Sequence, residues 1–293
     1  MQFSLYPTVA DSAKQSRYRT EINQLSTRDR PAHDWYRFVL SFPPHLVRHY
    51  LQQFAISKNQ RVLDPFCGTG TTIVECKKLG IPGVGIEGNP MAYFASCVKS
   101  DWSPDPDGLL RHAHQVAEQV AEKLSASGLN DHVLPLPLFH SGLSEAGASA
   151  QQDADSLLLK DLSAEQRSLL LKNSISPLPL HKTLVLLETL DELADERYLK
   201  HERLALAKAL VFSISNLHFG PEVSVKRAKE DAPVVAPWLE QIQAIAQDLQ
   251  TLSPHTQTEV RVHHADAREI RTILPPNSID AVITSPPYPN EKD

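Results

Sequence analysis

One stretch decides the fold of this chain: Arg61-Val62-Leu63-Asp64-Pro65-Phe66-Cys67-Gly68-Thr69-Gly70-Thr71-Thr72. It begins as a short apolar strand and passes through a glycine-rich turn. A helix is then expected through Leu79, with Gly80 as its end. The pattern predicts a second short strand at 83–87 and another helix from Asn89-Pro90 to about Lys99. Strand, glycine-rich turn, helix and strand form the first βαβ unit of a doubly wound parallel sheet.

Strand patterns return only near the end of the sequence, at 259–264 and 279–284. The intervening segment, 101–257, has helical periods and almost no strand signal. Its helices are predicted at 107–125, 181–195, 197–217 and 233–251. We therefore predict an α/β fold with a Rossmann-like sheet, built from 1–100 and 258–293. Residues 101–257 are predicted to be a large helical insertion that serves as a target-recognition or lid module.

Composition excludes several classes of protein. Of the 293 residues, 41% are apolar and 22% are charged, which is typical of a globular protein and too apolar for general disorder. No apolar run approaches the ~18 residues of a membrane span, and no signal peptide is visible. Three cysteines without a CxxC spacing argue against a disulfide framework or a zinc site. These features indicate a cytoplasmic protein.

The charge is distributed unevenly along the chain. The net charge is −6, yet residues 1–100 hold 12 basic and 7 acidic residues. The arginines of this region cluster at positions 17, 19, 28, 30 and 37. They form either a solvated face or a contact with a phosphate backbone.

The glycine-rich turn suits a nucleotide-like ligand, but not every kind. Gly68 and Gly70 let the backbone approach a ligand at a helix N-terminus. The third glycine of a dinucleotide fingerprint is replaced by Ile73, and no Gly-Lys-Ser/Thr follows, so NAD and P-loop readings are disfavoured. Glu87, at the end of the second strand, is placed to accept hydrogen bonds from two ribose hydroxyls.

The fourth strand runs into Ser285-Pro286-Pro287-Tyr288. Consecutive prolines remove backbone donors, so the loop offers mainly acceptors, which suits a substrate with an exocyclic amine. Tyr288 offers a flat face on which a base can stack.

Taken together, Asp64–Thr72 and Thr284–Tyr288 resemble the S-adenosylmethionine-dependent DNA amino-methyltransferases. Serine before Pro-Pro-Tyr is similar to the N4-cytosine branch of that family. The resemblance implies that S-adenosylmethionine is the cofactor and DNA the partner. It also implies that the catalytic loop holding the flipped base is Ser285, Pro286, Pro287 and Tyr288. By the same resemblance, the cofactor-binding residues are Phe42, Pro43, Asp64, Phe66, Gly68, Gly70, Thr71, Glu87 and Asp266.

Three alternatives stay open: methylation of adenine N6 in DNA, amino methylation of RNA, and a non-catalytic cofactor-binding subunit. C5-cytosine chemistry is disfavoured because none of the three cysteines follows a proline. No His/Cys cluster suggests a metal ion.

The strand count predicts a partial sheet. Four strands are visible, whereas the resembled family has seven, three of them after the Pro-Pro-Tyr loop. The fourth strand, with Ala281, Val282 and Ile283, would then form an edge that is prone to association. We therefore expect a fragment of a longer protein, or one completed by a second polypeptide. Alone, it is expected to bind cofactor weakly, to aggregate and to show little methylation.

Overall fold

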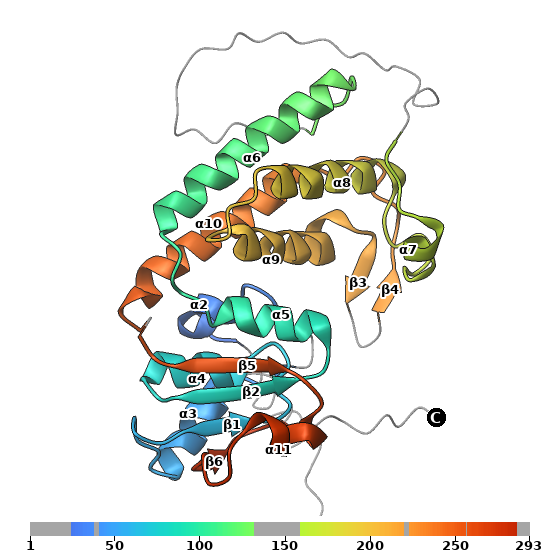
Figure 1. The fold of residues 1–293 in the computed structure, drawn as a ribbon. Helices are drawn as coiled ribbons and strands as arrows, with labels where there is room; N and C mark the ends of the chain where they lie inside the picture. The colour runs from blue at the N-terminus through green and yellow to red at the C-terminus, as the bar shows by residue number, and fades with distance from the viewer. Residues whose placement is uncertain (1–24, 38–40, 132–158, 220–222, 256, 286–293) are drawn as a thin grey trace, which may run out of the picture. The chain divides into compact units, whose positions relative to one another are not determined.

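The computed structural model describes residues 25–37, 41–131, 159–219, 223–255 and 257–285 (Figure 1). The chain forms two compact units. The first comprises 1–103 and 248–293, and the second comprises 104–247. Within the described part of the chain, no helix is long and apolar enough to cross a bilayer.

The first unit is built on a four-stranded parallel sheet of order β5-β2-β1-β6. Its strands are β1 (Val62–Asp64), β2 (Gly83–Glu87), β5 (Val260–His264) and β6 (Ala281–Val282). Leu63 of β1 pairs with Val84 of β2 on one side and with Val282 of β6 on the other. The chain therefore adds strands first on one side of β1 and then on the other, which confirms the predicted doubly wound sheet.

Helices of the first unit cover both faces of this sheet. They are α2 (Arg30–His33), α3 (Pro44–Gln53), α4 (Thr71–Leu79), α5 (Pro90–Lys99) and α11 (Ile270–Ile273). Short 3-10 turns occupy Thr27–Asp29, Ser253–His255 and Ala267–Glu269. Gly80 ends α4 with φ +73°, and the Asn89 side chain caps α5 by accepting from the N–H groups of Met91 and Ala92.

Successive residues of β1 point to opposite faces and so belong to different core clusters. Val62 packs with Val47 and Leu51 of α3 and with Ile283, which follows β6. Leu63 lies in a second cluster with Val84 and Ile86, against which side chains of α11 and its flanks pack. Val282, on the edge strand, is 54% exposed.

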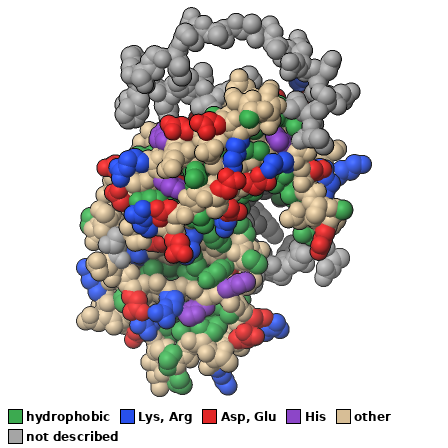
Figure 2. Space-filling view, turned by 45° about the horizontal axis from the view of Figure 1, so that its top comes forward, with side chains coloured by type: hydrophobic (Ala, Val, Ile, Leu, Met, Phe, Trp, Pro, Cys, Tyr) green, Lys and Arg blue, Asp and Glu red, His purple; other side chains and the backbone are tan. Residues whose placement is uncertain are grey.

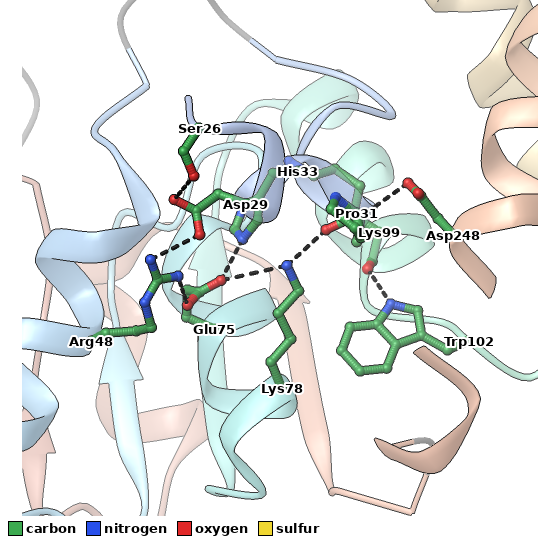
Figure 3. Close-up of polar contacts among 11 residues, drawn as sticks. Ser26, Asp29, Pro31, His33, Arg48, Glu75, Lys78, Lys99, Trp102 and Asp248 are labelled. Atoms are coloured by element: carbon green, nitrogen blue, oxygen red, sulfur yellow. Dashed lines mark hydrogen bonds and ion pairs between the residues drawn. The ribbon is translucent and has the colours of Figure 1, made fainter. Parts of the chain in front are cut away.

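A buried polar network ties the segment before α3 to α4 (Figure 3). Glu75 of α4, 1% exposed, accepts hydrogen bonds from His33 Nε2 to Oε1 at 2.7 Å and from Arg48 Nη1 to Oε2 at 2.6 Å. Arg48 Nη2 also lies 2.8 Å from Asp29 Oδ1. Burial opposes ionisation of Glu75, but the hydrogen bond from His33 and the nearby cations outweigh it and lower the pKa of Glu75. The network fixes residues 26–37 against the sheet unit.

The basic cluster of the first third is only partly described. Arg28 and Arg30 are exposed, while positions 17 and 19 lie outside the described residues. Figure 2 shows Lys and Arg side chains interspersed with Asp and Glu over the face it presents. Phosphate contact by these arginines therefore stays a prediction.

The second unit is mainly helical. Its helices are α6 (Pro106–Ala126), α7 (Ala164–Ser168), α8 (Pro177–Glu192), α9 (Leu199–Ala209) and most of α10 (Val235–Leu252), which runs past the unit boundary at residue 247. A π-helical turn, Leu210–Ile214, follows α9. Trp238 of α10 is fully buried and donates its Nε1–H to the Glu202 carbonyl.

A two-stranded antiparallel ribbon departs from the all-helical expectation. Its strands are β3 (Leu217–Phe219) and β4 (Val223–Val225), with His218 opposite Ser224. The helix predicted at 197–217 instead ends in the π-helical turn, and its last residue, Leu217, begins β3. Local periodicity missed β3 because its hydrogen bonds go to a segment that follows it in sequence.

Candidate functional site

Asp64 stands at the carboxyl end of β1 and is completely buried. Its Oδ1 accepts hydrogen bonds from the Phe66 N–H at 3.1 Å and from Thr284 Oγ1 at 2.7 Å. Its Oδ2 has no hydrogen-bond partner among the described residues. Burial raises the pKa of Asp64, and the neighbouring hydroxyls of Thr284 and Thr72 and the Phe66 N–H oppose that rise. A buried carboxylate oxygen without a donor is costly, which makes it a natural acceptor for a cationic or N–H ligand group.

Glu87, at the carboxyl end of the neighbouring β2, organises the glycine-rich turn. Its Oε2 accepts the Gly68 N–H at 2.7 Å, and its Oε1 accepts the Asn89 N–H at 2.7 Å. An ionised carboxylate has about four lone-pair sites, so Glu87 retains acceptor capacity beyond these two bonds. The side chain is partly exposed and thus accessible to a ligand.

The two glycines of the turn, Gly68 and Gly70, have different surroundings. Both have a left-handed backbone, with φ +52° at Gly68 and +85° at Gly70. A Cβ on Gly70 would lie 2.4 Å from Ser96 Oγ, so this glycine is needed for the close approach of α4 and α5. A Cβ on Gly68 would meet no atom within 4 Å. Gly68 therefore faces open space beside Glu87, and it is the glycine placed to let a ligand approach the backbone.

The carboxyl end of β5 contributes further side chains to the candidate site. His264 stacks on Tyr93 of α5 with ring centroids 5.0 Å apart, and its Nε2 lies 3.2 Å from the Gly88 carbonyl. Asp266, two residues on, pairs with the Arg268 guanidinium, which lowers the pKa of Asp266 to about 2. Asp266 is ionised near neutral pH and partly exposed, so it remains available as an acceptor.

The other residues that the sequence predicted for the site are placed as follows. Phe66 is 44% exposed, and Thr71 is buried at the start of α4. Phe42 packs against the core cluster that contains Ile283, and Pro43 precedes α3. Ser285 is described and partly buried, directly after Thr284. Pro286, Pro287 and Tyr288 lie outside the described residues.

The structure thus joins two motifs that are 220 residues apart in sequence. The hydroxyl of Thr284 binds Asp64, so the segment leading into Ser285 starts at the buried carboxylate. Sequence reasoning did not place Tyr93 at this site, and it did not link Thr284 to Asp64 or Asn89 to Glu87. For Thr284 the available signals were its position at the end of a predicted strand and its place in the Thr284–Tyr288 motif.

The chemical groups that these residues offer match those of S-adenosylmethionine. The cofactor carries an ammonium group, two ribose hydroxyls and an adenine amine. The unpartnered Asp64 oxygen, the acceptor capacity of Glu87 and the open space at Gly68 match such groups. Within the described residues, no group of three or more His, Cys, Asp or Glu side chains is placed to hold a metal ion.

Comparison with known proteins gives consistent results. Residues 8–95 match the N6/N4 DNA methylase family. The chain is 25% identical over 285 residues to Type II methyltransferase M.BsoBI of Geobacillus stearothermophilus, covering 94% of this chain and 53% of that relative. Type II methyltransferase M.MjaII of Methanocaldococcus jannaschii is 32% identical over 72 residues, which cover 25% of this chain and 13% of the relative. M.AvaI of Anabaena variabilis, also a Type II methyltransferase, is 29% identical over 73 residues, covering 25% of this chain and 15% of the relative.

The chain spans about half the length of M.BsoBI and less of the other two relatives. No solved structure matches it. The matches confirm the resemblance drawn from the two motifs, and they do not separate N4 from N6 methylation.

Proposed function

We propose that this chain, which belongs to the DNA amino-methyltransferase family, transfers a methyl group from S-adenosylmethionine to N4 of cytosine in DNA. The observation that carries the proposal is the bond between Thr284 and Asp64. It links a buried carboxylate that has a free oxygen to the strand end that continues into Ser285-Pro286-Pro287-Tyr288. A cofactor held at Asp64 and a base held by that loop would therefore lie close together.

Three carboxylates are proposed to hold the cofactor. Asp64 Oδ2 accepts from its ammonium group, and Glu87 accepts from the ribose hydroxyls. Asp266 accepts from the adenine amine. The bound cofactor supplies an electrophilic methyl group. Phe42, Pro43, Phe66 and Thr71 are proposed to line the same pocket, and Gly68 to allow the close backbone approach. Gly70 is also proposed to belong to this pocket, although the lack of room for a Cβ beside Ser96 already explains why a glycine stands there.

The loop after β6 is proposed to hold the base. A base inside a duplex must be flipped out, at a cost of a few kcal/mol. Tyr288 stacks on the flipped base and recovers part of that cost. Ser285 Oγ and the Pro286 carbonyl accept the amine hydrogens, while Pro287 keeps the loop rigid. The nitrogen lone pair is thereby directed at the methyl group, and positioning supplies much of the rate.

Two of the three cysteines, Cys67 and Cys76, are unsuited to the nucleophilic step of C5 methylation. C5 chemistry needs a thiolate nucleophile. Cys67 and Cys76 are buried at 3% and 0% exposure, and burial raises the pKa of Cys76 to about 12 and that of Cys67 further. Neither thiol is placed to attack a base.

The test is transfer of labelled methyl groups to unmethylated genomic DNA of mixed sequence, followed by digestion and separation of the nucleosides. Label is expected in N4-methylcytosine, at the low yield predicted above for this chain alone, and Tyr288→Ala should abolish most of it. Label in N6-methyladenine would show that adenine rather than cytosine is the target base, and amino methylation of DNA would still be the reaction. Cofactor binding in calorimetry without any transfer, to DNA or to RNA, would favour the non-catalytic reading.

A further inference from the structure

The ribbon β3–β4 in the second unit has an unusual amount of exposed surface. All three residues of β4, Val223, Ser224 and Val225, are exposed. Because neighbouring residues of a strand point to opposite faces, both faces of β4 are uncovered. Phe212, in the π-helical turn that packs beside β3, is 56% exposed. An isolated two-stranded ribbon is marginally stable in water, so something must hold its base.

Asn216 holds the base of the ribbon. This residue is 3% exposed and stands just before β3. Its Nδ2 donates to the Asn173 carbonyl at 3.0 Å and to Ser176 Oγ at 3.2 Å. Its Oδ1 accepts the Lys229 N–H at 2.8 Å, and its carbonyl accepts the Lys226 N–H at 2.9 Å. One buried amide therefore fixes the chain on both sides of the ribbon.

Basic side chains follow directly after β4. Lys226 and Arg227 are exposed and form no ion pair with any described residue. Lys229 differs, because its Nζ donates to the Ser213 carbonyl at 2.7 Å and so reinforces the base. These three are the basic cluster of a segment, 101–257, that holds 13 basic and 22 acidic residues. Two unpaired cations beside a ribbon with uncovered faces suit a polyanion of matching shape.

We infer that β3–β4, with Lys226 and Arg227, is a DNA-contacting ribbon. The major groove of B-DNA, about 12 Å wide, admits a two-stranded ribbon. Lys226 and Arg227 contact phosphates at the groove edge, while the exposed face of β4 lies against base edges. This inference rests on the proposed function, since it names the surface by which the same chain holds its DNA.

Duplex DNA is a better occupant than an apolar protein surface. The valine side chains of β4 are small, and the ribbon is flanked by charged residues, whereas the fully buried centre of a protein interface is depleted in charge. Phosphate contacts give a direct measurable signature, because each one adds to the salt dependence of binding.

The experiment compares three forms of the whole chain: wild type, Lys226→Ala/Arg227→Ala, and Lys200→Ala/Arg203→Ala as the matched control. Both pairs remove two exposed positive charges from the second unit, and the control pair also removes the ion pair between Arg203 and Asp191. Binding of a fluorescein-labelled mixed-sequence duplex is measured by anisotropy from 50 to 200 mM salt. S-adenosylmethionine binding is measured by calorimetry on the same preparations.

For the ribbon pair we expect at least a tenfold loss of duplex affinity near 100 mM salt. The slope of log K against log salt should become shallower by about two, because each phosphate contact contributes about −0.9. The control pair should match the wild type, and cofactor binding should be equal in all three forms.

A ribbon pair that binds duplex like the wild type would overturn the inference and leave the proposed function intact. Equal losses in both pairs would also overturn it, because the effect would then be one of net charge. A wild-type chain that binds cofactor but no duplex would overturn the inference and the proposed function together. Asn216→Asp adds a further check. It keeps the basic side chains but removes the Nδ2 donors, and it should lower duplex affinity without changing cofactor affinity.

Discussion

Replacing Asp64 with asparagine should separate cofactor binding from folding. Asparagine keeps an oxygen in the place of Oδ1, so the hydrogen bonds from Phe66 N–H and Thr284 Oγ1 remain. Oδ2 has no donor to lose among the described residues. The amide N–H groups find no acceptor there, which costs stability, but the buried charge is removed. We expect the free energy of unfolding at pH 7 to stay within about 1 kcal/mol of the wild-type value or to rise.

Cofactor affinity should respond much more strongly. If Oδ2 accepts from the ammonium group, Asp64→Asn loses a charge-assisted hydrogen bond worth about 1.5–3 kcal/mol. At about 1.4 kcal/mol per factor of ten, the Kd for S-adenosylmethionine should rise roughly 10- to 150-fold. Calorimetry measures the affinity, and urea unfolding measures the stability.

The pH dependence gives an independent check of the buried charge. Because burial raises the pKa of Asp64 in the folded chain, its contribution to stability is greatest at low pH and is lost as the pH rises through that pKa. Any stability advantage of Asp64→Asn should therefore grow with rising pH and vanish in acid.

Asp248→Asn is the matched control. Asp248 lies in the same unit, burial also raises its pKa, and its Oδ2 already accepts from Trp35 Nε1 at 2.7 Å and the Ala32 N–H at 3.2 Å. This variant should bind cofactor normally. A folded Asp64→Asn protein with wild-type cofactor affinity would refute the assignment of Oδ2.

Three other outcomes are expected. Gly70→Ala should lower the free energy of unfolding by about 1–3 kcal/mol or more, because a left-handed alanine there also meets Ser96. Gly68→Ala should lower the free energy of unfolding less than Gly70→Ala does, and it should weaken cofactor binding more. If urea unfolding and calorimetry rank the two variants the other way round, the assignment of Gly68 to the cofactor site is wrong. Burial holds the pKa of His33 at about 4, so unfolding should become easier by up to about 3 kcal/mol as the pH falls from about 6.5 to 4. A flat urea midpoint over that range would disprove this. Tyr288→Ala should weaken binding to a mismatched duplex by about 1–3 kcal/mol and Tyr288→Phe much less, whereas equal effects would exclude stacking.

The sequence alone determined the local elements of the sheet unit. The glycine-rich turn, the left-handed end of α4 at Gly80 and the cap of α5 at Asn89 depend on residues a few positions apart. Local backbone preference and capping are sufficient for these, which is why the βαβ unit was predicted correctly. The family resemblance likewise rests on contiguous motifs, and the comparisons confirmed it.

Only the tertiary structure decided which distant residues meet. The bond from Thr284 to Asp64 depends on β6 pairing beside β1, and the buried ionic network around Glu75 joins segments from 29 to 78. Asn216, at the base of the ribbon β3–β4, binds Asn173 and Ser176, about 40 residues earlier. Such contacts follow from burial and from the satisfaction of polar groups between distant segments. Periodicity and turn chemistry depend on residues only a few positions apart, so they cannot predict contacts between segments far apart in sequence.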